Sequence, residues 1–214
     1  MAQEMAELSR KEREFARRER DILDAAISLF NSPDWRQVTV AEIAKKADVG
    51  KGTVYKHFES KEEIYAHIAY EFQSQMTNIL RNLDSSQPFD SVMRSLIRQS
   101  FDLFIRFPAQ ARVYMHHKHS EISEQLSPEC RISCIASKNQ QEHEELIFSI
   151  IECGIEQGAI PERPVRHIMV GMSATFDGVL NMIWDGNVAE DFELSQEELV
   201  TLITQYMVSG IKGL

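Results

Sequence analysis

The stretch Thr39–Lys61 reads TVAEIAKKADVGKGTVYKHFESK and predicts two short helices joined by a tight turn. Thr39 and Glu42 have the spacing of a capping box, in which each side chain bonds the other residue's backbone N–H, so the first helix begins after Thr39. Asp48 and Gly50 then accept the backbone angles that a turn between crossed helices needs. The pattern is typical of a helix-turn-helix.

The second of these helices carries its apolar residues on one face. Val49, Val54 and Phe58 have the spacing of an inward-facing stripe. Ser60 and Glu63 form another capping box, which starts the next helix after a two-residue break. The outer surface of the second helix is therefore expected to consist of Lys51, Gly52, Thr53, Tyr55, Lys56 and His57.

This outer surface suits the major groove of duplex DNA. The groove admits one helix, and a helix-turn-helix inserts its second helix there while the first crosses the backbone. Gly52 removes bulk near the sugar-phosphate wall, and lysines supply positive charge to phosphates. A solvated hairpin with outward lysines is the alternative, and it is disfavoured because capping, turn and polar signals agree over one short span. The predicted DNA-binding residues are Thr39, Lys51, Gly52, Thr53, Tyr55, Lys56, His57 and Lys61.

Residues Arg20–Tyr65 resemble the N-terminal domain of TetR-family transcriptional regulators. The resemblance rests on ILDAA in the first helix, TVAEIA in the second, VGKGTVYKHF in the third and SKE after it. It implies an all-helical homodimer with three DNA-binding helices and a larger ligand-sensing domain, and it implies a repressor. Gly50 stands where the family often has Ser, so the recognition helix is expected to lack a side-chain N-cap.

The rest of the chain also reads as helical, without the period-two alternation of a sheet. We therefore expect an all-α fold, with a DNA-binding domain over residues 1–62 and a larger helical sensing and dimerisation domain over residues 63–214. Apolar spacing together with capping residues, Pro and Gly predicts further helices over residues 60–83, 89–107, 109–119, 128–157 and 165–184, and a last helix that begins at Ser195 and carries apolar residues as far as Ile211.

Composition places the chain among soluble globular proteins, with 43% hydrophobic and 26% charged residues in 214. It has no run of about 18 apolar residues and no apolar signal core, so we expect a cytoplasmic protein that makes no membrane contact. The net charge of −10 is uneven, because residues 1–57 hold 11 basic and 10 acidic residues and the remainder holds 12 and 23. The acidic part repels phosphate and leaves the N-terminal part for DNA. Six cations crowd the lead-in to the first helix, for phosphate contact or as a solvated, frayed segment: Arg10, Lys11, Arg13, Arg17, Arg18 and Arg20.

Small residues line one strip of the helix predicted over residues 165–184, and such strips let helix axes approach closely. Two such helices from each of two subunits would form a four-helix interface, which the resemblance also implies. Packing of the same strip within one chain is the alternative. One short helix reads few base pairs, so a homodimer on a palindromic operator with half-sites about 34–36 Å apart is expected. The predicted interface residues are Val170, Ala174, Gly178, Leu202 and Tyr206.

The central helices supply soft and aromatic side chains that suit an apolar or aromatic small-molecule effector, such as a hydrophobic drug, an acyl chain or an aromatic compound. Binding of the effector is expected to shift the helix after Ser60 and so change the separation of the two recognition helices. The candidate ligand-binding residues are Phe101, Phe104, Met115, Phe148, Met172 and Phe176.

Two other functions stay open. The segment His116–His119 with Cys130 and Cys134 suggests a metal- or thiol-sensing regulator, although the spacing matches no structural zinc module, and we predict neither metal nor cofactor. A helical adaptor for a protein partner is the other. No phosphate-binding glycine loop, nucleophile elbow or metalloprotease helix is present, so we predict no catalytic residues and no enzyme. Operator sequence, target genes, effector and the direction of the response stay undetermined by the sequence.

Overall fold

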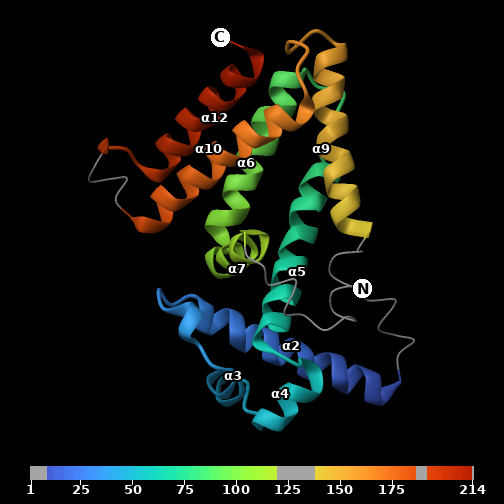
Figure 1. Ribbon diagram of the computed structural model, residues 1–214, viewed down its shortest axis with the longest axis vertical. Coiled ribbons are helices and arrows are strands. Elements are labelled where there is room, and N and C mark those ends of the chain that lie inside the picture. The colour runs from blue at the N-terminus through green and yellow to red at the C-terminus, as the bar shows by residue number, and fades with distance from the viewer. Residues whose placement is uncertain (1–8, 120–137, 187–191, 214) are drawn as a thin grey trace. The chain divides into compact units, whose positions relative to one another are not determined.

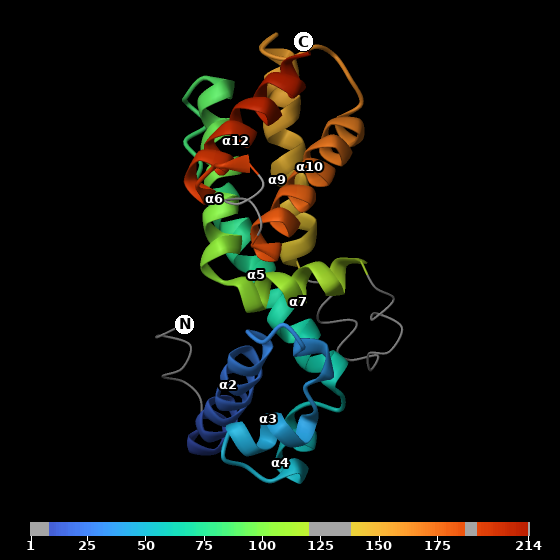
Figure 2. The same ribbon diagram turned by 90° about the vertical axis from the view of Figure 1, so that its left-hand side faces the viewer.

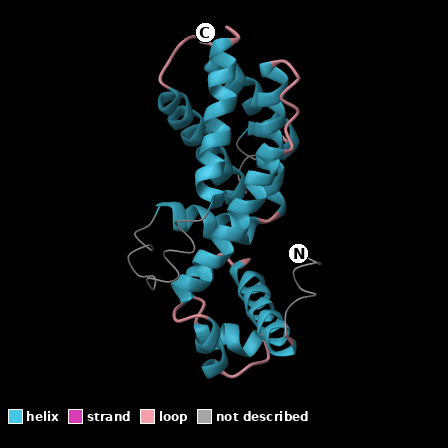
Figure 3. Ribbon diagram, turned by 90° about the vertical axis from the view of Figure 1, so that its right-hand side faces the viewer, coloured by secondary structure: helices cyan, strands magenta, loops and turns pink. Residues whose placement is uncertain are grey.

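The computed structural model describes residues 9–119, 138–186 and 192–213, and every regular element within these ranges is a helix (Figures 1 and 3). The expected all-α fold is therefore confirmed for the described residues. In chain order the elements are α2 (Arg10–Phe30), the 3-10 helix η1 (Trp35–Gln37), α3 (Val40–Lys46), α4 (Lys51–His57), α5 (Lys61–Arg81), α6 (Phe89–Arg106), α7 (Pro108–His119), α9 (Lys138–Glu156), α10 (Val165–Asp185) and α12 (Gln196–Lys212).

The chain divides into two compact units. The first comprises Met1–Gln73 and Phe107–Ser137, and the second comprises Ser74–Arg106 and Lys138–Leu214. Helix α5 thus begins in the first unit and ends in the second. The domain boundary that we expect after residue 62 concerns where the DNA-binding function ends, and it stays a prediction.

Local capping explains where several helices begin. At α3 the Thr39 hydroxyl accepts from the Glu42 N–H at 3.3 Å, and the Glu42 carboxylate accepts from the Thr39 N–H at 2.8 Å, as the sequence predicts. The box predicted at Ser60 forms only in half. Its hydroxyl accepts from the Glu63 N–H at 3.1 Å, but the Glu63 carboxylate accepts from the Glu59 N–H at 2.6 Å, one residue early.

In the first unit α3 packs against α2, and α4 packs against α3 (Figure 2). Val54 of α4 and Phe58, which directly follows α4, are 0% and 1% exposed, and this confirms the predicted inward stripe. Burying side chains of this size contributes about 1.5–3 kcal/mol each. The other fully buried members of this core include Ile22, Ala26, Phe30, Ile43, Ile64, Ile68 and Val113.

The second unit has its own apolar core among α6, α9, α10 and α12. Large buried side chains there include Met93, Ile97, Phe101, Phe104, Ile151 and Leu180. Ion pairs tie neighbouring helices on its surface, joining Arg81 of α5 to Glu142 of α9 at 2.5 Å and Lys212 of α12 to Asp90 of α6 at 2.9 Å.

The predicted helices outside the DNA reader largely match the observed ones. The helix expected over residues 128–157 is observed as α9 from Lys138, and residues 128–137 lie outside the described residues. Gly158 follows α9 with a φ of 67°, a left-handed angle that suits glycine at a helix end. Among the described helices, none has the length and apolar character that crossing a membrane would need.

Candidate nucleic-acid interface

The turn before α4 fixes the direction of that helix. Asp48 adopts a φ of 53°, and the Val49 N–H reaches back to the Ala44 carbonyl at 3.0 Å. Asp tolerates this left-handed conformation better than most residues. Gly50 is the N-cap of α4 and makes no side-chain hydrogen bond to it, as the sequence predicts.

Helix α4 buries one face and exposes the other. Opposite Val54 and Phe58, the residues Lys51, Gly52 and Lys56 are exposed, and the Tyr55 ring is 46% exposed. The Lys51 ammonium lies 5.7 Å from the centre of the Tyr55 ring, within range of a cation–π contact. A large aromatic side chain exposed beside two lysines suits a surface that contacts sugar and phosphate.

Thr39 stands at the beginning of α3 and its side chain is occupied by capping. Its hydroxyl donates to the Glu42 carboxylate at 2.8 Å and accepts from the Glu42 backbone N–H. Hydrogen bonds from the Thr39 backbone and hydroxyl hold the pKa of Glu42 below its usual value. Glu42 therefore stays negatively charged beside Thr39. The prediction that Thr39 contacts DNA does not take this charge into account.

Lys61 bridges two parts of the first unit. Its ammonium donates to the carbonyl oxygens of Arg36 at 2.8 Å and Val38 at 3.2 Å, and it lies 5.4 Å from the Tyr65 ring centre. Two of its three protons thus fasten the start of α5 to the segment before α3. The predicted phosphate contact by Lys61 stays a prediction, and it would be made by a side chain that these bonds already hold.

The expectation that His57 lies on the outer surface of α4 is wrong. Its side chain is only 5% exposed, because the ring packs on Phe15 of α2 with ring centres 4.0 Å apart. Its Nδ1 lies 3.9 Å from a carboxylate oxygen of Glu19, too far for a hydrogen bond. Sequence spacing within α4 gave no sign of this contact, because its partners lie about 40 residues away.

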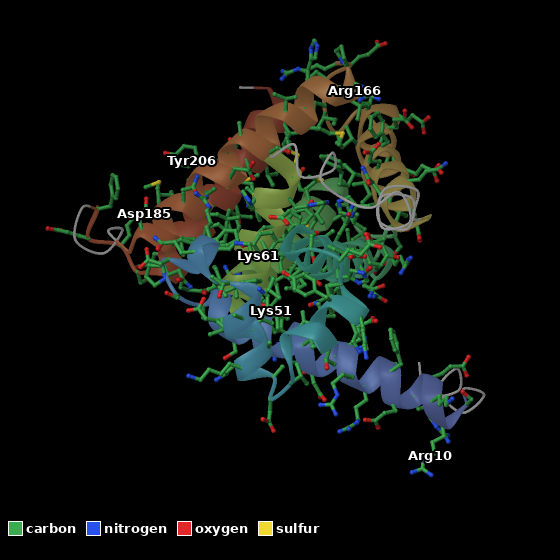
Figure 4. The ribbon with its side chains drawn as sticks, turned by 60° about the horizontal axis from the view of Figure 1, so that its bottom comes forward. Arg10, Lys51, Lys61, Arg166, Asp185 and Tyr206 are labelled. Atoms are coloured by element: carbon green, nitrogen blue, oxygen red, sulfur yellow. The ribbon has the colours of Figure 1, made fainter. Side chains whose placement is uncertain are left out.

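The basic lead-in is an ordered helix from Arg10. Ser9 and Glu12 form a capping box, with the Glu12 carboxylate 2.7 Å from the Ser9 N–H. The S-x-x-E spacing of these residues was a usable signal in the sequence. Figure 4 places Arg10 near the beginning of α2 and Lys51 at the beginning of α4.

Three of the candidate ligand residues pack together in the second unit. Phe176 packs on Phe101 and Phe104, with ring centres 4.3 and 5.0 Å apart, and Phe101 and Phe104 are buried. The Phe148 ring lies under the Arg166 guanidinium at 5.5 Å. Met172 lines a groove of about 320 Å³ between α10 and α12, with Tyr206 and Gly210 among its other lining residues. Met115 belongs to α7 in the first unit.

The predicted interface residues lie on exposed parts of α10 and α12, which run side by side (Figure 1). Val170, Tyr206 and Leu202 are 68%, 63% and 38% exposed, and Ala174 and Gly178 are exposed as well. A methyl group built at Gly178 would meet no atom within 4 Å. The five predicted interface residues are thus exposed in the described part of the chain, and their contact with a second copy stays a prediction.

The residues named for metal or thiol sensing occupy ordinary packing positions where they are described. The His116 ring makes edge contacts with Trp35 and Tyr65, at 5.4 and 5.9 Å, and burial followed by the charges of Arg36 and Lys61 lowers its pKa. Burial also lowers the pKa of His117. Cys130 and Cys134 lie outside the described residues.

The exposed recognition helix and its turn define a helix-turn-helix DNA-binding domain of a transcriptional regulator. The model of the family described as "Bacterial regulatory proteins, tetR family" matches residues 22–68. Residues 22–68 are therefore similar to the DNA-binding domain of TetR-family regulators, and solved TetR-family structures share the fold. Proteins of this family are transcriptional regulators and not enzymes.

Similar proteins extend the likeness over most of the chain. The uncharacterized HTH-type transcriptional regulator YhgD of Bacillus subtilis is 28% identical over 92% of this chain and 97% of its own length. The biofilm operon icaADBC negative regulator IcaR of Staphylococcus epidermidis is 28% identical over 59% of this chain and 65% of its own. The transcriptional regulator FadR of Bacillus subtilis, solved with stearoyl-CoA, has a TM-score of 0.66 at 22% identity, over 90% of this chain and 97% of its own, and shares the fold.

Proposed function

We propose that this regulator is a homodimeric repressor that binds a palindromic operator and releases it when an apolar or aromatic small molecule binds. The proposal rests mainly on the two faces of α4, of which one is buried and the other exposed. Val54 and Phe58 are buried, while Lys51, Tyr55 and Lys56 are exposed and unobstructed within the first unit. A helix of this composition offers the major groove its donors and positive charge.

The length of α4 supports binding as a pair. Its seven residues extend about 10 Å along the helix axis, which covers only a few base pairs. Two copies on successive turns of the same DNA face would double the sequence that is read. The exposed strip of α10 and α12 is our candidate for the surface that joins them, because exposed apolar groups such as Val170 and Tyr206 gain by burial against a second copy.

The effector class is proposed from the side chains of the second unit and from similar proteins. Phe101, Phe104 and Phe176 form an aromatic group that suits an apolar ligand. FadR of Bacillus subtilis, which shares the fold, binds stearoyl-CoA in its crystal structure. IcaR is named a negative regulator, which favours repression. We expect the protein to act in the cytoplasm.

The DNA half of the proposal can be tested without knowing the target genes. Duplexes with about 30 randomised base pairs, about three helical turns, would be selected on the full-length protein and the enriched sequence used as operator. The Tyr55→Ala and Lys56→Ala variants are expected to bind it at least about tenfold more weakly. Arg94→Ala removes an exposed positive charge from α6 in the second unit and serves as the control. Unchanged affinity in both α4 variants would remove the proposed recognition helix.

The effector half needs a separate experiment. Mass spectrometry of the protein as purified, under conditions that retain bound molecules, would reveal a co-purified apolar compound, and adding that compound is expected to release the operator. Titrating operator binding with a chelator and with an oxidant tests the alternative, a regulator that senses a metal or the oxidation of thiols. Loss of binding with either reagent, and no response to the compound, would favour metal or thiol sensing by the same DNA reader.

A further inference from the structure

The first half of α2 lies outside the segment that the family shares, yet it touches the recognition helix. The family match begins at residue 22, whereas Phe15 and Glu19 precede it. Both contact His57, the last residue of α4. Because a recognition helix has to meet base edges at a defined angle, a contact at its end bears directly on DNA reading.

We propose that Phe15 and Glu19 are positioning residues, which set the roll of the recognition helix about its own axis by holding His57. The inference rests on the proposed function of α4 as the DNA reader. It assigns to the start of α2 a role in operator specificity that does not require those residues to touch DNA.

The anchors of α4 explain why a third contact matters. Val54 lies within α4, and Phe58 directly follows the helix with an extended φ of −138°. Both are buried in the core of the first unit, and they oppose translation of the helix more than its roll. His57 projects about 60° to one side of Val54, since each residue turns the helix by about 100°. A contact at His57 therefore opposes the roll that the two apolar anchors permit.

A small roll has a large effect at the DNA surface. Side chains end about 6 Å from the axis of a helix, so a roll of about 20° moves their tips by about 2 Å. Hydrogen bonds to base edges tolerate only a few tenths of an ångström around 2.9 Å. The exposed side chains of Tyr55 and Lys56 would then lose specific contacts while still reaching phosphates.

The packing around His57 is close enough to act as such a clamp. Its ring lies over that of Phe15 at an interplanar angle of 32°, and only 5% of the His57 side chain is exposed. Among the described residues its Nδ1 is buried without a hydrogen-bond partner, and the Glu19 carboxylate 3.9 Å away is the acid that faces it. The Glu19 side chain is 33% exposed, so its charge is only partly screened by solvent.

Phe15 is only partly buried, because 48% of its surface is exposed. It adds little to the core formed around Ile22 and Phe30 of the same helix. Its contact with the buried His57 side chain is therefore the interaction through which Phe15 acts on α4.

The test compares operator binding with non-specific binding for single and double variants of the full-length protein. The probes are the duplex selected by the wild type and a scrambled duplex of the same length. Phe15→Ala is expected to weaken operator binding about tenfold and scrambled-duplex binding less than about twofold. Phe15→Tyr keeps the aromatic ring and is expected to bind the operator with the affinity of the wild type. In a His57→Ala background, Phe15→Ala is expected to have little further effect.

Glu19→Gln is a second test, and it leaves the apolar contacts of His57 intact. Its matched control is Glu14→Gln, which removes a carboxylate from the same helix beside Arg17 instead of His57. We expect Glu19→Gln, but not Glu14→Gln, to bind the operator more weakly than the wild type. The proposal is overturned if Phe15→Ala and Glu19→Gln bind the operator like the wild type, if operator and scrambled duplexes lose affinity equally, or if the effects of Phe15→Ala and His57→Ala add. A wild type that selects no duplex would instead refute the proposed function.

Discussion

The Lys61 ammonium donates to the carbonyl of Arg36 at 2.8 Å and so joins the first turn of α5 to the segment that precedes α3. A second bond, to the Val38 carbonyl at 3.2 Å, strengthens the connection. Both carbonyls follow η1 or belong to it, where few backbone donors are available. A lysine that sequence spacing assigns to DNA thus has a structural function within the reader.

Replacing Lys61 by Met is therefore expected to reduce the free energy of unfolding by about 1–2 kcal/mol, the usual range for partly exposed hydrogen bonds from a charged donor. The measurement is urea denaturation followed by circular dichroism. Lys61→Arg keeps the charge with a different geometry. Its free energy of unfolding is expected to lie between those of the wild type and Lys61→Met. A Lys61→Met protein as stable as the wild type, but weak in operator binding, would show that phosphate contact is the main function of Lys61.

Gly154 permits the close approach of α9 to α6. A methyl group at this position would lie 2.5 Å from ring atoms of Phe89, well inside contact distance, and Gly154 is buried. Gly154→Ala is therefore expected to destabilise the protein by about 1–3 kcal/mol despite the better helix propensity of Ala. In a Phe89→Leu background the penalty of Gly154→Ala should shrink, because the smaller side chain leaves room. Equal penalties in both backgrounds would contradict the assigned contact.

His117 predicts a pH dependence of stability. Burial lowers the pKa of its ring in the folded protein, so below the ordinary value of about 6.5 the unfolded chain binds a proton that the folded chain does not. The stabilisation is present above that pH and is lost as the pH falls. Chemical denaturation between pH 7.5 and pH 5, values that span the ordinary pKa by about one unit or more, should show a steeper loss for the wild type than for His117→Phe. Parallel curves would exclude this contribution.

The interface prediction can be tested with one charge. Tyr206→Glu places a carboxylate on the exposed strip of α12, where burial against a second copy would desolvate it. Sedimentation velocity is expected to show a dimer for the wild type and a monomer for the variant. Phe192→Glu changes another exposed aromatic residue of the second unit, outside the predicted strip, and should leave the dimer intact. Dissociation by both variants, or by neither, would argue against this surface.

The parts of the fold that the sequence predicts well depend on neighbours in the chain. The Thr39–Glu42 capping box and the Val54–Phe58 stripe follow from spacings of three and four residues, and both are observed. Contacts between distant segments were not predictable in this way. Phe15, 42 residues before His57, covers that ring, and carbonyls more than 20 residues before Lys61 hold its ammonium.

The candidate ligand set shows the same limit in the second unit. Aromatic content identifies Phe101, Phe104 and Phe176, which do pack together. Composition alone cannot separate a ligand wall from an ordinary core, nor can it place Met172, whose position in the groove beside Tyr206 depends on how α10 meets α12.

Hydroxyl-radical footprinting of the wild type on its selected duplex tests the central claim most directly. The account predicts two protected stretches on one face of the DNA, with centres about one helical turn, or about 34–36 Å, apart, and predicts that Tyr55→Ala removes both. A single protected stretch, or a two-part footprint that Tyr55→Ala leaves unchanged, would contradict it.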